Sequence, residues 1–536
     1  MENRLENALA RGEFVVTCEL IPGRGAHEEA QKKELSHASD IYNTGRIHAI
    51  SITDNPGGSP ALLADFVAMD FMREGATSLV HFTCKDRNRN QMQAQLYAME
   101  RSGIQNILVM SGDYQVPSYG GRSRPVFDLD PVQVLRMVGE MNSGLPVQGP
   151  KGEVKEKPTH LFPGAVVNPF KYKEGELIPQ YLKLEKKLLS GAKFIITQLG
   201  YDARKMEEVI LYARERGFNT PFIGNVFLVT KGAASLMRKG RIAGCHISDA
   251  YMKILEAEAG LPDKGKAARI VRAAKMIAIY KGLGFAGIHI GGFGLNAETV
   301  TRILDQAEAL ADGWRDYARE ISYGDPNGYF LYDAEVDAAG QKTGLNAPSK
   351  AKRTEVPTDG RIFRGYRFSR FCHYWFFTLN RRFCKVLARV MDRCDRKNGI
   401  HRHHGVELIG KALVYGCMDC GDCGLETCAY ICPMTQCPKS QRNGPCGGSM
   451  EGWCEVYPQE RYCIHYMAYH RLKRYNETEK LTRYITPPNN WDFFGTSGWS
   501  NYTHRRDNSA HRIPVKIGME TTPDNVLPEK RKENTD

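Results

Sequence analysis

The chain has 536 residues, of which 42% are hydrophobic and 25% charged, and its formal net charge is +12. This length exceeds what one hydrophobic core usually supports, so we expect more than one domain. No run approaches the ~20 apolar residues of a membrane helix, and the start "MENRLENALARGEF" lacks the apolar core of a signal peptide, so a cytoplasmic protein without a membrane span is predicted.

The first 310 residues or so alternate short apolar runs with longer segments of helical spacing. Eight β-rich runs can be counted, from "EFVVTCEL" near the start to "FAGIHIGGF". Between them lie helix candidates such as "RNQMQAQLYAMERSG", which ends in Gly as helix C-termini prefer. Eight strand and helix repeats predict an α/β fold, a (β/α)8 TIM barrel over residues 1–310. An open doubly wound sheet is the competing interpretation.

Polar side chains stand where the predicted strands end. Because a barrel's active site forms at the C-terminal ends of its strands, these side chains are candidate site residues. They are Glu19, Asp54, His81 with Thr83, Asp113, Asn168, Gln198 and His289. Each alone could equally cap a strand or satisfy a core hydrogen bond, but buried polar groups are costly unless paired, so their convergence indicates a site. No Walker loop, H-E-x-x-H or G-x-S-x-G motif is present, which disfavours an NTPase, zinc protease or hydrolase.

A basic, aromatic-rich segment follows, within a connecting region predicted to be helical over residues 311–405. Residues 341–400 hold 15 Lys and Arg against 4 Asp and Glu, with aromatics interleaved in "GYRFSRFCHYWFFTLNRR". Complementary charge speeds protein encounter, so this segment predicts docking of an acidic partner. A connector whose arginines lie along apolar surface is an equal alternative. Nucleic-acid binding is disfavoured, because no nucleic-acid fold accompanies the charge.

Nine of the 15 cysteines fall within the 47 residues from 417 to 463. They are Cys417, Cys420, Cys423, Cys428, Cys432, Cys437, Cys446, Cys454 and Cys463. Stacked C-x2-C units and C-P pairs are typical of iron-sulfur ligation, in which four thiolates hold a [4Fe-4S] cluster, and structural zinc is the main rival. The sequence therefore predicts a smaller metal-binding domain over residues 406–475, followed by an extended, partly disordered tail over 476–536.

Several segments of the barrel region carry a family resemblance. "VTCELIPGRG", "SITDNPGGS", "HFTCKDRNRNQMQAQLYAMERSGIQNILVMSGD", "LEKKLLSGAKFIITQLGYD" and "GIHIGGFGLN" resemble, in this order, successive blocks of methylenetetrahydrofolate reductases. The family fold is a (β/α)8 barrel that holds FAD. The resemblance implies flavin-dependent reduction of 5,10-methylenetetrahydrofolate to 5-methyltetrahydrofolate, or the reverse oxidation.

The same resemblance assigns expected roles to individual residues. Glu19 matches the glutamate that acts as general acid toward the folate, Asp113 matches the aspartate beside pterin and flavin, and Gln198 resembles the glutamine that contacts folate. Lys186 and Lys187 take the places of basic residues near the FAD phosphates, although a solvated helix face explains them equally well. The implied cofactor-binding set is Asp54, His81, Thr83, Asn168, Lys186 and Lys187.

The cysteine-rich segment carries a second resemblance. "GCMDCGDCGLETCAYICPMTQCPKSQRNGPCGGSMEGWCEVYP" is similar to a domain found as partner subunit or C-terminal fusion of methylenetetrahydrofolate reductases in anaerobic one-carbon pathways. This implies iron-sulfur clusters that connect the barrel flavin to an acidic electron carrier, such as ferredoxin or flavodoxin, which would dock on the basic segment, or to an NAD(P)H-oxidising subunit. A homo-oligomer is compatible with the sequence.

Departures from the family pattern leave two further hypotheses open. The segment after the fifth strand reads "VNPFKYKEG", Ser111 replaces an arginine, and the last strand reads "HIGGFGLN". The loss of these flavin contacts keeps open a flavin-free, tetrahydrofolate-dependent methyltransferase or demethylation module. A non-catalytic electron-transfer or scaffold subunit is the other hypothesis, and the joint presence of Glu19, Asp113 and Gln198 argues against it.

Overall fold

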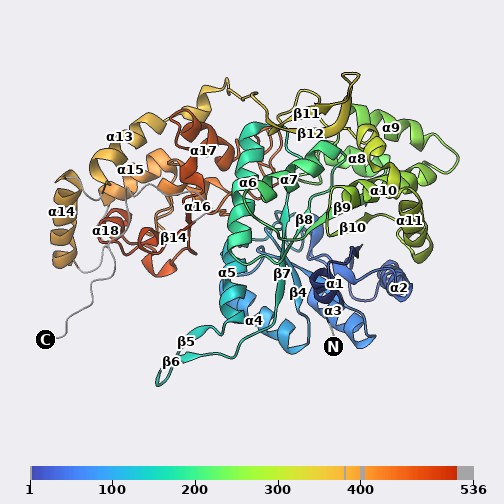
Figure 1. Ribbon diagram of the computed structural model, residues 1–536. Coiled ribbons are helices and arrows are strands. Elements are labelled where there is room, and N and C mark those ends of the chain that lie inside the picture. Colours follow the sequence, from blue (N-terminus) through green and yellow to red (C-terminus); the bar gives the residue numbers. More distant parts are fainter. Residues whose placement is uncertain (1–2, 379–381, 399–404, 516–536) are drawn as a thin grey trace.

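A closed, all-parallel barrel forms the first part of the chain in the computed structural model, which describes residues 3–378, 382–398 and 405–515 (Figure 1). Its strand order is β1-β10-β9-β8-β7-β4-β3-β2. The strands are β1 (Val15–Leu20), β2 (Ala49–Ile52), β3 (Ser78–Thr83), β4 (Asn106–Met110), β7 (Phe162–Val167), β8 (Phe194–Thr197), β9 (Phe222–Leu228) and β10 (Gly287–Gly292). Because β1 pairs with both β2 and β10, the sheet closes, which confirms the predicted barrel and excludes an open doubly wound sheet.

Helices between the strands form the outer layer of the barrel. They are α2 (Glu29–Asn43), α3 (Ala64–Arg73), α4 (Arg89–Arg101), α5 (Pro131–Asn142), α6 (Glu174–Leu189), α7 (Ala203–Glu215), α8 (Lys231–Arg238), α9 (Asp249–Ala259), α10 (Lys266–Gly282) and α11 (Ala297–Ala309). Helix α5 shows how sequence sets these boundaries: Asp130 and Gln133 form a capping box, and Pro131 occupies the first turn. A hairpin of β5 (Pro146–Gly149) and β6 (Gly152–Lys155) projects from the barrel (Figure 1).

The barrel interior is apolar at one end and polar toward the other. Its apolar layer includes Val15, Leu79, Phe194 and Ile223, and helix α1 (Arg4–Ala10) packs Leu5 against it. Further along the strands, Thr17 and His289 are partners in the register of β1 and β10. The site chemistry therefore lies toward the C-terminal ends of the strands, as the barrel fold requires.

The region predicted to be a helical connector also contains a β-hairpin. Helix α12 (Trp314–Glu320) is followed by the antiparallel pair β11 (Tyr332–Val336) and β12 (Lys342–Lys350), and only then by α13 (Tyr366–Phe376), α14 (Arg382–Asn398) and α15 (Gly405–Tyr415). The hairpin forms because "DAAG" provides a turn between two short runs, with Gly340 at a φ of +77°. In the described residues, no helix is long and apolar enough to cross a membrane.

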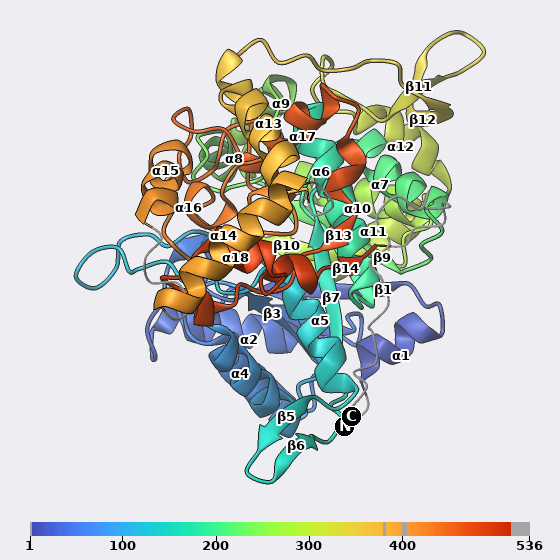
Figure 2. The ribbon, with the colours of Figure 1, turned by 90° about the vertical axis from the view of Figure 1, so that its left-hand side faces the viewer.

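The C-terminal part of the chain packs against one side of the barrel (Figures 1 and 2). It contains α16 (Pro433–Gln436), α17 (Ile464–Lys473), β13 (Tyr484–Ile485), α18 (Gly498–Thr503) and β14 (Ile513–Pro514). Helix α17 lies on α6 so closely that a β-carbon at Gly175 would lie 2.4 Å from the His470 Nε2 atom.

Residues 476–515, part of the tail predicted to be extended and partly disordered, contain the short elements β13, α18 and β14. Buried Asp422 explains this, because its carboxylate accepts hydrogen bonds from both the backbone N–H and the side-chain amide of Asn508, each at 2.7 Å. Polar contacts rather than an apolar pattern therefore hold the segment, and residues 516–536 lie outside the described part of the chain.

Candidate active site

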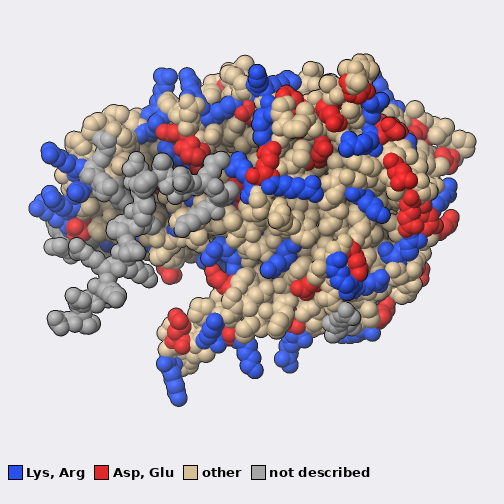
Figure 3. All heavy atoms as spheres, viewed as in Figure 1, with Lys and Arg blue, Asp and Glu red and all other residues tan. Residues whose placement is uncertain are grey.

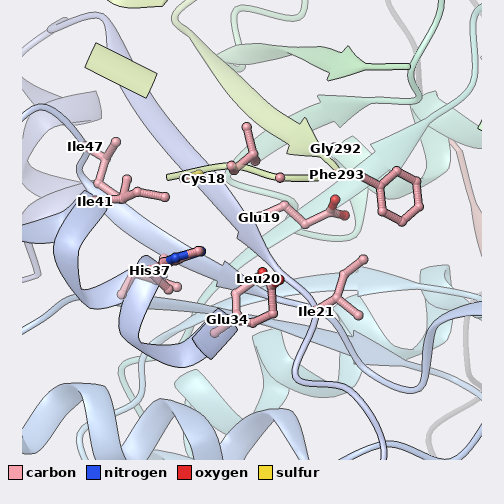
Figure 4. Close-up of a pocket in the computed structure, with 14 residues that line it drawn as sticks. Cys18, Glu19, Leu20, Ile21, Glu34, His37, Ile41, Ile47, Gly292 and Phe293 are labelled. Carbon is pink, nitrogen blue, oxygen red and sulfur yellow. The ribbon is translucent and has the colours of Figure 1, made fainter. Parts of the chain in front are cut away.

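Glu19 stands at the C-terminal end of β1, beside Phe293 (Figure 4). Burial raises the pKa of its carboxyl to about 7, and the backbone N–H of Gly292 offsets this only in part. The strand register sets Gly291 next to it, and a β-carbon at that glycine would lie 2.8 Å from the Glu19 Oε2 atom. The absence of a side chain at Gly291 therefore leaves room for the Glu19 carboxyl group. Burial of this group keeps part of it protonated near neutral pH.

A pocket of about 220 Å³ opens beside Glu19, between β1, α2 and the turn after β10 (Figure 4). Its wall is largely apolar, with Ile41, Ile47 and Phe293 among the lining residues, and His37 adds a polar group. Typical ligand pockets measure roughly 300–1,000 Å³, so this pocket suits part of a large ligand rather than all of it.

Two neutral histidines lie below the rim, inside the barrel. The His289 Nδ1 atom is 2.9 Å from the Thr17 hydroxyl, and the His81 Nε2 atom is 2.9 Å from the Ser51 hydroxyl. Burial lowers the pKa of His81 to about 4 and that of His289 to about 3. Both imidazoles are therefore uncharged at neutral pH and act through hydrogen bonds.

Asp54 and Thr83, predicted separately, contact each other. The Thr83 hydroxyl donates to the Asp54 carboxylate at 2.7 Å, and Arg87 forms an ion pair with the same carboxylate. Asp113 instead lies half-buried at the rim after β4, where its carboxylate accepts the backbone N–H of Gly57 at 2.7 Å. The Asp54 carboxylate is thus engaged by protein groups in the barrel wall, whereas Asp113 lies at the rim.

The two predicted amides have different surroundings. Gln198, after β8, is half-buried, and its Oε1 atom accepts the backbone N–H of Leu199 at 2.8 Å. Asn168, after β7, donates from Nδ2 to the carbonyl groups of Gly244 at 2.7 Å and Gly447 at 3.0 Å. Asn168 therefore connects the barrel rim to the cysteine-rich segment.

Lys186 and Lys187 are buried on α6 rather than solvated. Burial lowers the pKa of Lys186 to about 8 and that of Lys187 to about 7, and the Lys187 ammonium donates to the carbonyl of Val166 at 2.5 Å. Lys186 lines a small pocket between α6 and the cysteine-rich segment.

The side chains predicted to bind FAD do not form an open cradle. Asp54 and Thr83 are paired, His81 bonds Ser51, and Asn168 and Lys187 donate to protein carbonyl groups. Their roles toward FAD stay predictions, and the residues as placed fit the flavin poorly.

The "RNGPCGG" loop, residues 442–448, lies on the barrel rim. Gly444 adopts a φ of +128°, and a β-carbon there would lie 2.9 Å from Lys183 of α6, so glycine permits the close approach. The Lys183 ammonium donates to the Gly444 carbonyl at 3.0 Å, and the Ser111 hydroxyl donates to the Cys446 carbonyl at 3.4 Å. The cysteine-rich segment is thus built into the edge of the candidate site.

Sequence reasoning missed the lysines that make this junction. Lys439 donates to the carbonyl of Gly112 at 2.7 Å and forms a buried ion pair with Glu455, and Lys171 donates to the carbonyl of Ser449. Lys439 stands within "CPKSQRNGPCGG", which carries the second resemblance, but no sequence pattern marks either lysine as a junction residue.

The nine clustered cysteines divide into two sets. The charge of Cys432 raises the pKa of four other thiols. These five residues form the first cysteine set: Cys417, Cys420, Cys423, Cys428 and Cys432. The pKa of Cys463 is raised well above its ordinary value by burial and by the thiols of Cys446, Cys454 and Cys437. These four residues form the second cysteine set, which includes Cys446 on the barrel rim.

Backbone N–H groups are aimed at the second set. Gln441 and Lys439 donate toward Cys437, Val456 and Tyr457 toward Cys454, Gly448 toward Cys446 and Tyr466 toward Cys463. Such hydrogen bonds favour thiolate over thiol, so the donor chemistry fits a thiolate-bound metal. As placed, no three Cys, His, Asp or Glu side chains of the described residues converge closely enough to hold a metal ion, and the metal stays a prediction.

Two protein families match the chain. Residues 4–308 match the family described as "Methylenetetrahydrofolate reductase", and residues 399–492 match the one described as "Methylene-tetrahydrofolate reductase C terminal". The first match covers the barrel, and the second covers all nine clustered cysteines.

Individual proteins show more distant similarity. Methylenetetrahydrofolate reductase 1 of Schizosaccharomyces pombe (strain 972) is 23% identical over 307 residues, which cover 54% of this chain and 46% of that protein. The chain therefore matches about half the length of this curated relative.

Two solved structures are similar at low TM-score. An uncharacterized protein from Clostridium thermocellum that binds two copies of 5-methyl-5,6,7,8-tetrahydrofolic acid has a TM-score of 0.40 at 14% identity, covering 58% of this chain and 99% of that one. Tryptophan synthase from M. tuberculosis has a TM-score of 0.29 at 10% identity, covering 57% and 93%. No functional conclusion rests on either likeness.

Proposed function

Because the chain belongs to the methylenetetrahydrofolate reductase family, we propose that it interconverts 5,10-methylenetetrahydrofolate and 5-methyltetrahydrofolate. The observation that carries this proposal is the burial of Glu19 at the barrel rim, which raises the pKa of its carboxyl group to about 7. The carboxyl group fits there because residue 291 is a glycine. An ordinary glutamate, with a pKa of ~4.3, would be almost fully ionised at neutral pH and a poor acid.

Glu19 is proposed to open the imidazolidine ring of the substrate. Its carboxyl proton goes to a ring nitrogen, the bond from that nitrogen to the methylene carbon breaks, and an iminium forms at the other nitrogen. The methylene carbon then takes up two electrons and a proton to become the methyl group. The complete reduction consumes two electrons and two protons, and a proton from water restores Glu19.

Asp113 and Gln198 are proposed to orient the pterin. The Asp113 carboxylate, held by the Gly57 N–H at the rim, can accept hydrogen bonds from pterin N–H groups. Gln198 is half-buried directly after β8, which β7 separates from β4, and can supply an amide donor. Orientation by two fixed groups lowers the entropy cost of reaching the reactive geometry.

The two cysteine sets are proposed to hold iron-sulfur clusters. An iron-sulfur cluster, when bound, exchanges single electrons at low potential. Cys437, Cys446, Cys454 and Cys463 would hold the one nearer the barrel, since Ser111 contacts the Cys446 backbone. Four of the five thiols of the first set would hold the outer one. Zinc is the rival occupant, and the count of thiols in each set suits either metal.

A flavin-free reaction is the second candidate. The engagement of Asp54, His81, Asn168 and Lys187 within the protein favours it, because those groups are the predicted FAD contacts. In this alternative the barrel transfers a methyl group to tetrahydrofolate without redox chemistry.

An anaerobic absorption spectrum, taken before and after acid precipitation, tests these proposals. Flavin released by acid together with broad iron-sulfur absorbance supports a flavin-dependent reductase. Iron-sulfur absorbance without released flavin would show that the protein holds no FAD. Turnover of 5,10-methylenetetrahydrofolate with a low-potential artificial donor then tests the reaction itself. A protein that contains both cofactors, accepts electrons and still fails to convert the folate would contradict the proposed reductase.

A further inference from the structure

Helices α13 and α14 expose a cluster of aromatic side chains at one end of the molecule. Phe371, Tyr374 and Phe376 of α13 and Phe383 of α14 are between 42% and 59% exposed. The half-buried ring of Trp375 joins them, since its centroid lies 6.2 Å from that of Phe371 and 5.6 Å from that of Phe383. We call these five residues the exposed aromatic cluster. A contiguous apolar patch at the surface marks an interaction site.

Helix α14 continues this surface with a basic and an apolar stripe. Its residues Lys385 and Arg389 are exposed, and so are Val386 and Val390 beside them. At about 100° per residue, the basic pair covers one half of the exposed side of the helix and the valines cover the other half. Cys384 is buried, which identifies the side that faces the protein. Helix α14 therefore lies along the surface with both stripes directed outward.

Helix α15 adds an uncharged apolar stripe. Its side chains Val406, Ile409 and Leu413 are exposed at helical spacing, and none of the exposed residues of this helix is charged. The Tyr415 hydroxyl at its end lies 2.7 Å from the Ser369 hydroxyl of α13, so the two helices lie side by side. Figure 2 looks onto this end of the molecule and shows α13, α14 and α15 on the near side.

Positive charge dominates the same end. Residues 360–393 contain nine Lys and Arg against one acid, Asp392. The Asp392 carboxylate is already engaged, because it lies 2.6 Å from the imidazole of His504. Lys and Arg side chains are visible where α14 lies (Figure 3). This charge opposes contact between two copies of the surface and favours an anionic partner.

A lipid surface fits this combination better than a nucleic acid does. Aromatic rings beside arginines also suit single-stranded nucleic acid, whose bases stack on flat rings. The aliphatic side chains of α14 and α15 offer a base neither stacking nor hydrogen bonds, whereas they can enter the acyl boundary of a bilayer. Trp and Tyr prefer the level of the lipid head groups, and Lys and Arg are attracted to anionic ones.

We propose that α13, α14 and α15 form a peripheral surface that binds an anionic lipid bilayer. The exposed aromatic cluster and the aliphatic stripes enter the head-group boundary, and Lys385 and Arg389 contact lipid phosphates. Helix α14 suits this role because an interfacial helix lies in the plane of the membrane with its basic side chains reaching to the head groups. The proposal goes beyond the proposed function and depends on neither a bound cofactor nor the folate reaction.

The test measures co-sedimentation of the full chain with vesicles of equal parts phosphatidylcholine and phosphatidylglycerol, and with vesicles of phosphatidylcholine alone. The wild type should bind the mixed vesicles at low salt, bind less at high salt because the charges are screened, and leave the neutral vesicles largely free. Lys385→Glu/Arg389→Glu should lower the partition coefficient for mixed vesicles ~10-fold or more. Phe371→Ser should lower it at low and high salt alike, because the apolar contact is not screened.

Matched control variants separate this surface from general effects. Lys151→Glu/Lys155→Glu reverses two exposed lysines of the hairpin that projects from the barrel, so it changes the net charge by the same amount (Figure 1). Phe66→Ser removes a ring of α3 that is 48% exposed. Both controls should bind mixed vesicles as the wild type does, and urea unfolding should show that all four variants are folded.

Four outcomes would overturn the proposal. A wild type that binds neither kind of vesicle would exclude a membrane surface, and equal vesicle binding by the charge variant and its control would place the contact elsewhere. Binding of a single-stranded oligonucleotide or of a small acidic protein that the variants lose, without vesicle binding by the wild type, would assign the surface to that partner. A dimer that Phe371→Ser abolishes would make it a self-association surface. Vesicle binding needs no turnover, so its failure and a failure of the folate reaction are distinguishable.

Discussion

Asn443 of the cysteine-rich segment donates two hydrogen bonds to one carboxylate oxygen of Asp130, from its backbone N–H at 3.0 Å and from its side-chain amide at 2.9 Å. The other Asp130 oxygen caps α5 by accepting the backbone N–H of Val132. One buried carboxylate therefore ends a barrel helix and anchors the cysteine-rich segment, so the two parts of the chain are coupled in folding.

Replacing Asn443 should destabilise the protein. In Asn443→Ala the Asp130 carboxylate loses its amide donor, and the backbone N–H of Thr486 loses its 2.7 Å acceptor. Buried groups left unsatisfied cost about 1–3 kcal/mol, so the free energy of unfolding, measured with urea, should fall by that amount. Asn327→Ala changes an exposed asparagine and is the control. An equal effect of both substitutions would show that the Asn443 contact is not structural.

The barrel could be predicted because its information is local. The pattern of each strand and each helix depends on residues that are close together in the sequence. The family resemblance, which the matches to both parts of the chain confirm, predicts the same fold. The ends of the strands also had to meet at one rim, so Glu19, Asp113 and Gln198 could be named as a group from sequence alone.

The junction between the two parts could not be predicted in the same way. Asn443 and Asp130 are 313 residues apart, and no periodicity reveals a contact of that kind. The contacts of segment 476–515 are hidden for the same reason, because Asn508 and Asp422 hold it through polar contacts between residues far apart in the sequence. Lys187 is polar by type and buried by tertiary structure, which composition does not reveal.

Glu19→Gln should abolish most turnover and leave the fold intact. Glutamine retains the size of the side chain but carries no transferable proton, so 5,10-methylenetetrahydrofolate reduction should fall by about 10²-fold or more, the scale of one general acid. Electron entry into the cysteine-rich segment from an artificial donor should persist. Near-normal folate turnover in this variant would remove Glu19 from the mechanism.

The pH dependence of folate reduction should follow the Glu19 proton. Because burial raises the pKa of this carboxyl to about 7, the acid form dominates below that pH and is lost above it. The rate of the folate half-reaction should therefore be level in mild acid and fall ~10-fold per pH unit above the pKa. This slope should disappear in Glu19→Gln. A profile that declines near pH 4 to 5 would mean that Glu19 has an ordinary pKa.

Gly291→Ala should impair the site without removing the acid. A β-carbon at this position would lie 2.8 Å from the Glu19 Oε2 atom, which is too close for van der Waals contact, so the carboxyl must move. Misplacement of a catalytic group by about 1 Å can cost ~10²-fold in rate. Turnover should fall toward that of Glu19→Gln, while absorbance of any bound cofactor persists. Gly294→Ala, where nothing lies within 4 Å of an added β-carbon, provides a nearby comparison, although its φ of +74° adds backbone strain.

The two cysteine sets should lose metal independently. Cys420→Ser removes a thiol of the first set, and Cys454→Ser removes one of the second. If each set holds one [4Fe-4S] cluster, anaerobic wild-type protein should contain about eight iron and eight sulfide per chain, and each variant about four. Cys372→Ser, on α13 and outside both sets, should retain the wild-type content. Reduction from a low-potential carrier should stop in both cluster variants, because both sets lie on the proposed electron route. Zinc without acid-labile sulfide in the wild type would instead make the cysteine-rich segment a structural clamp on the barrel, held by contacts such as that of Asn443 with Asp130.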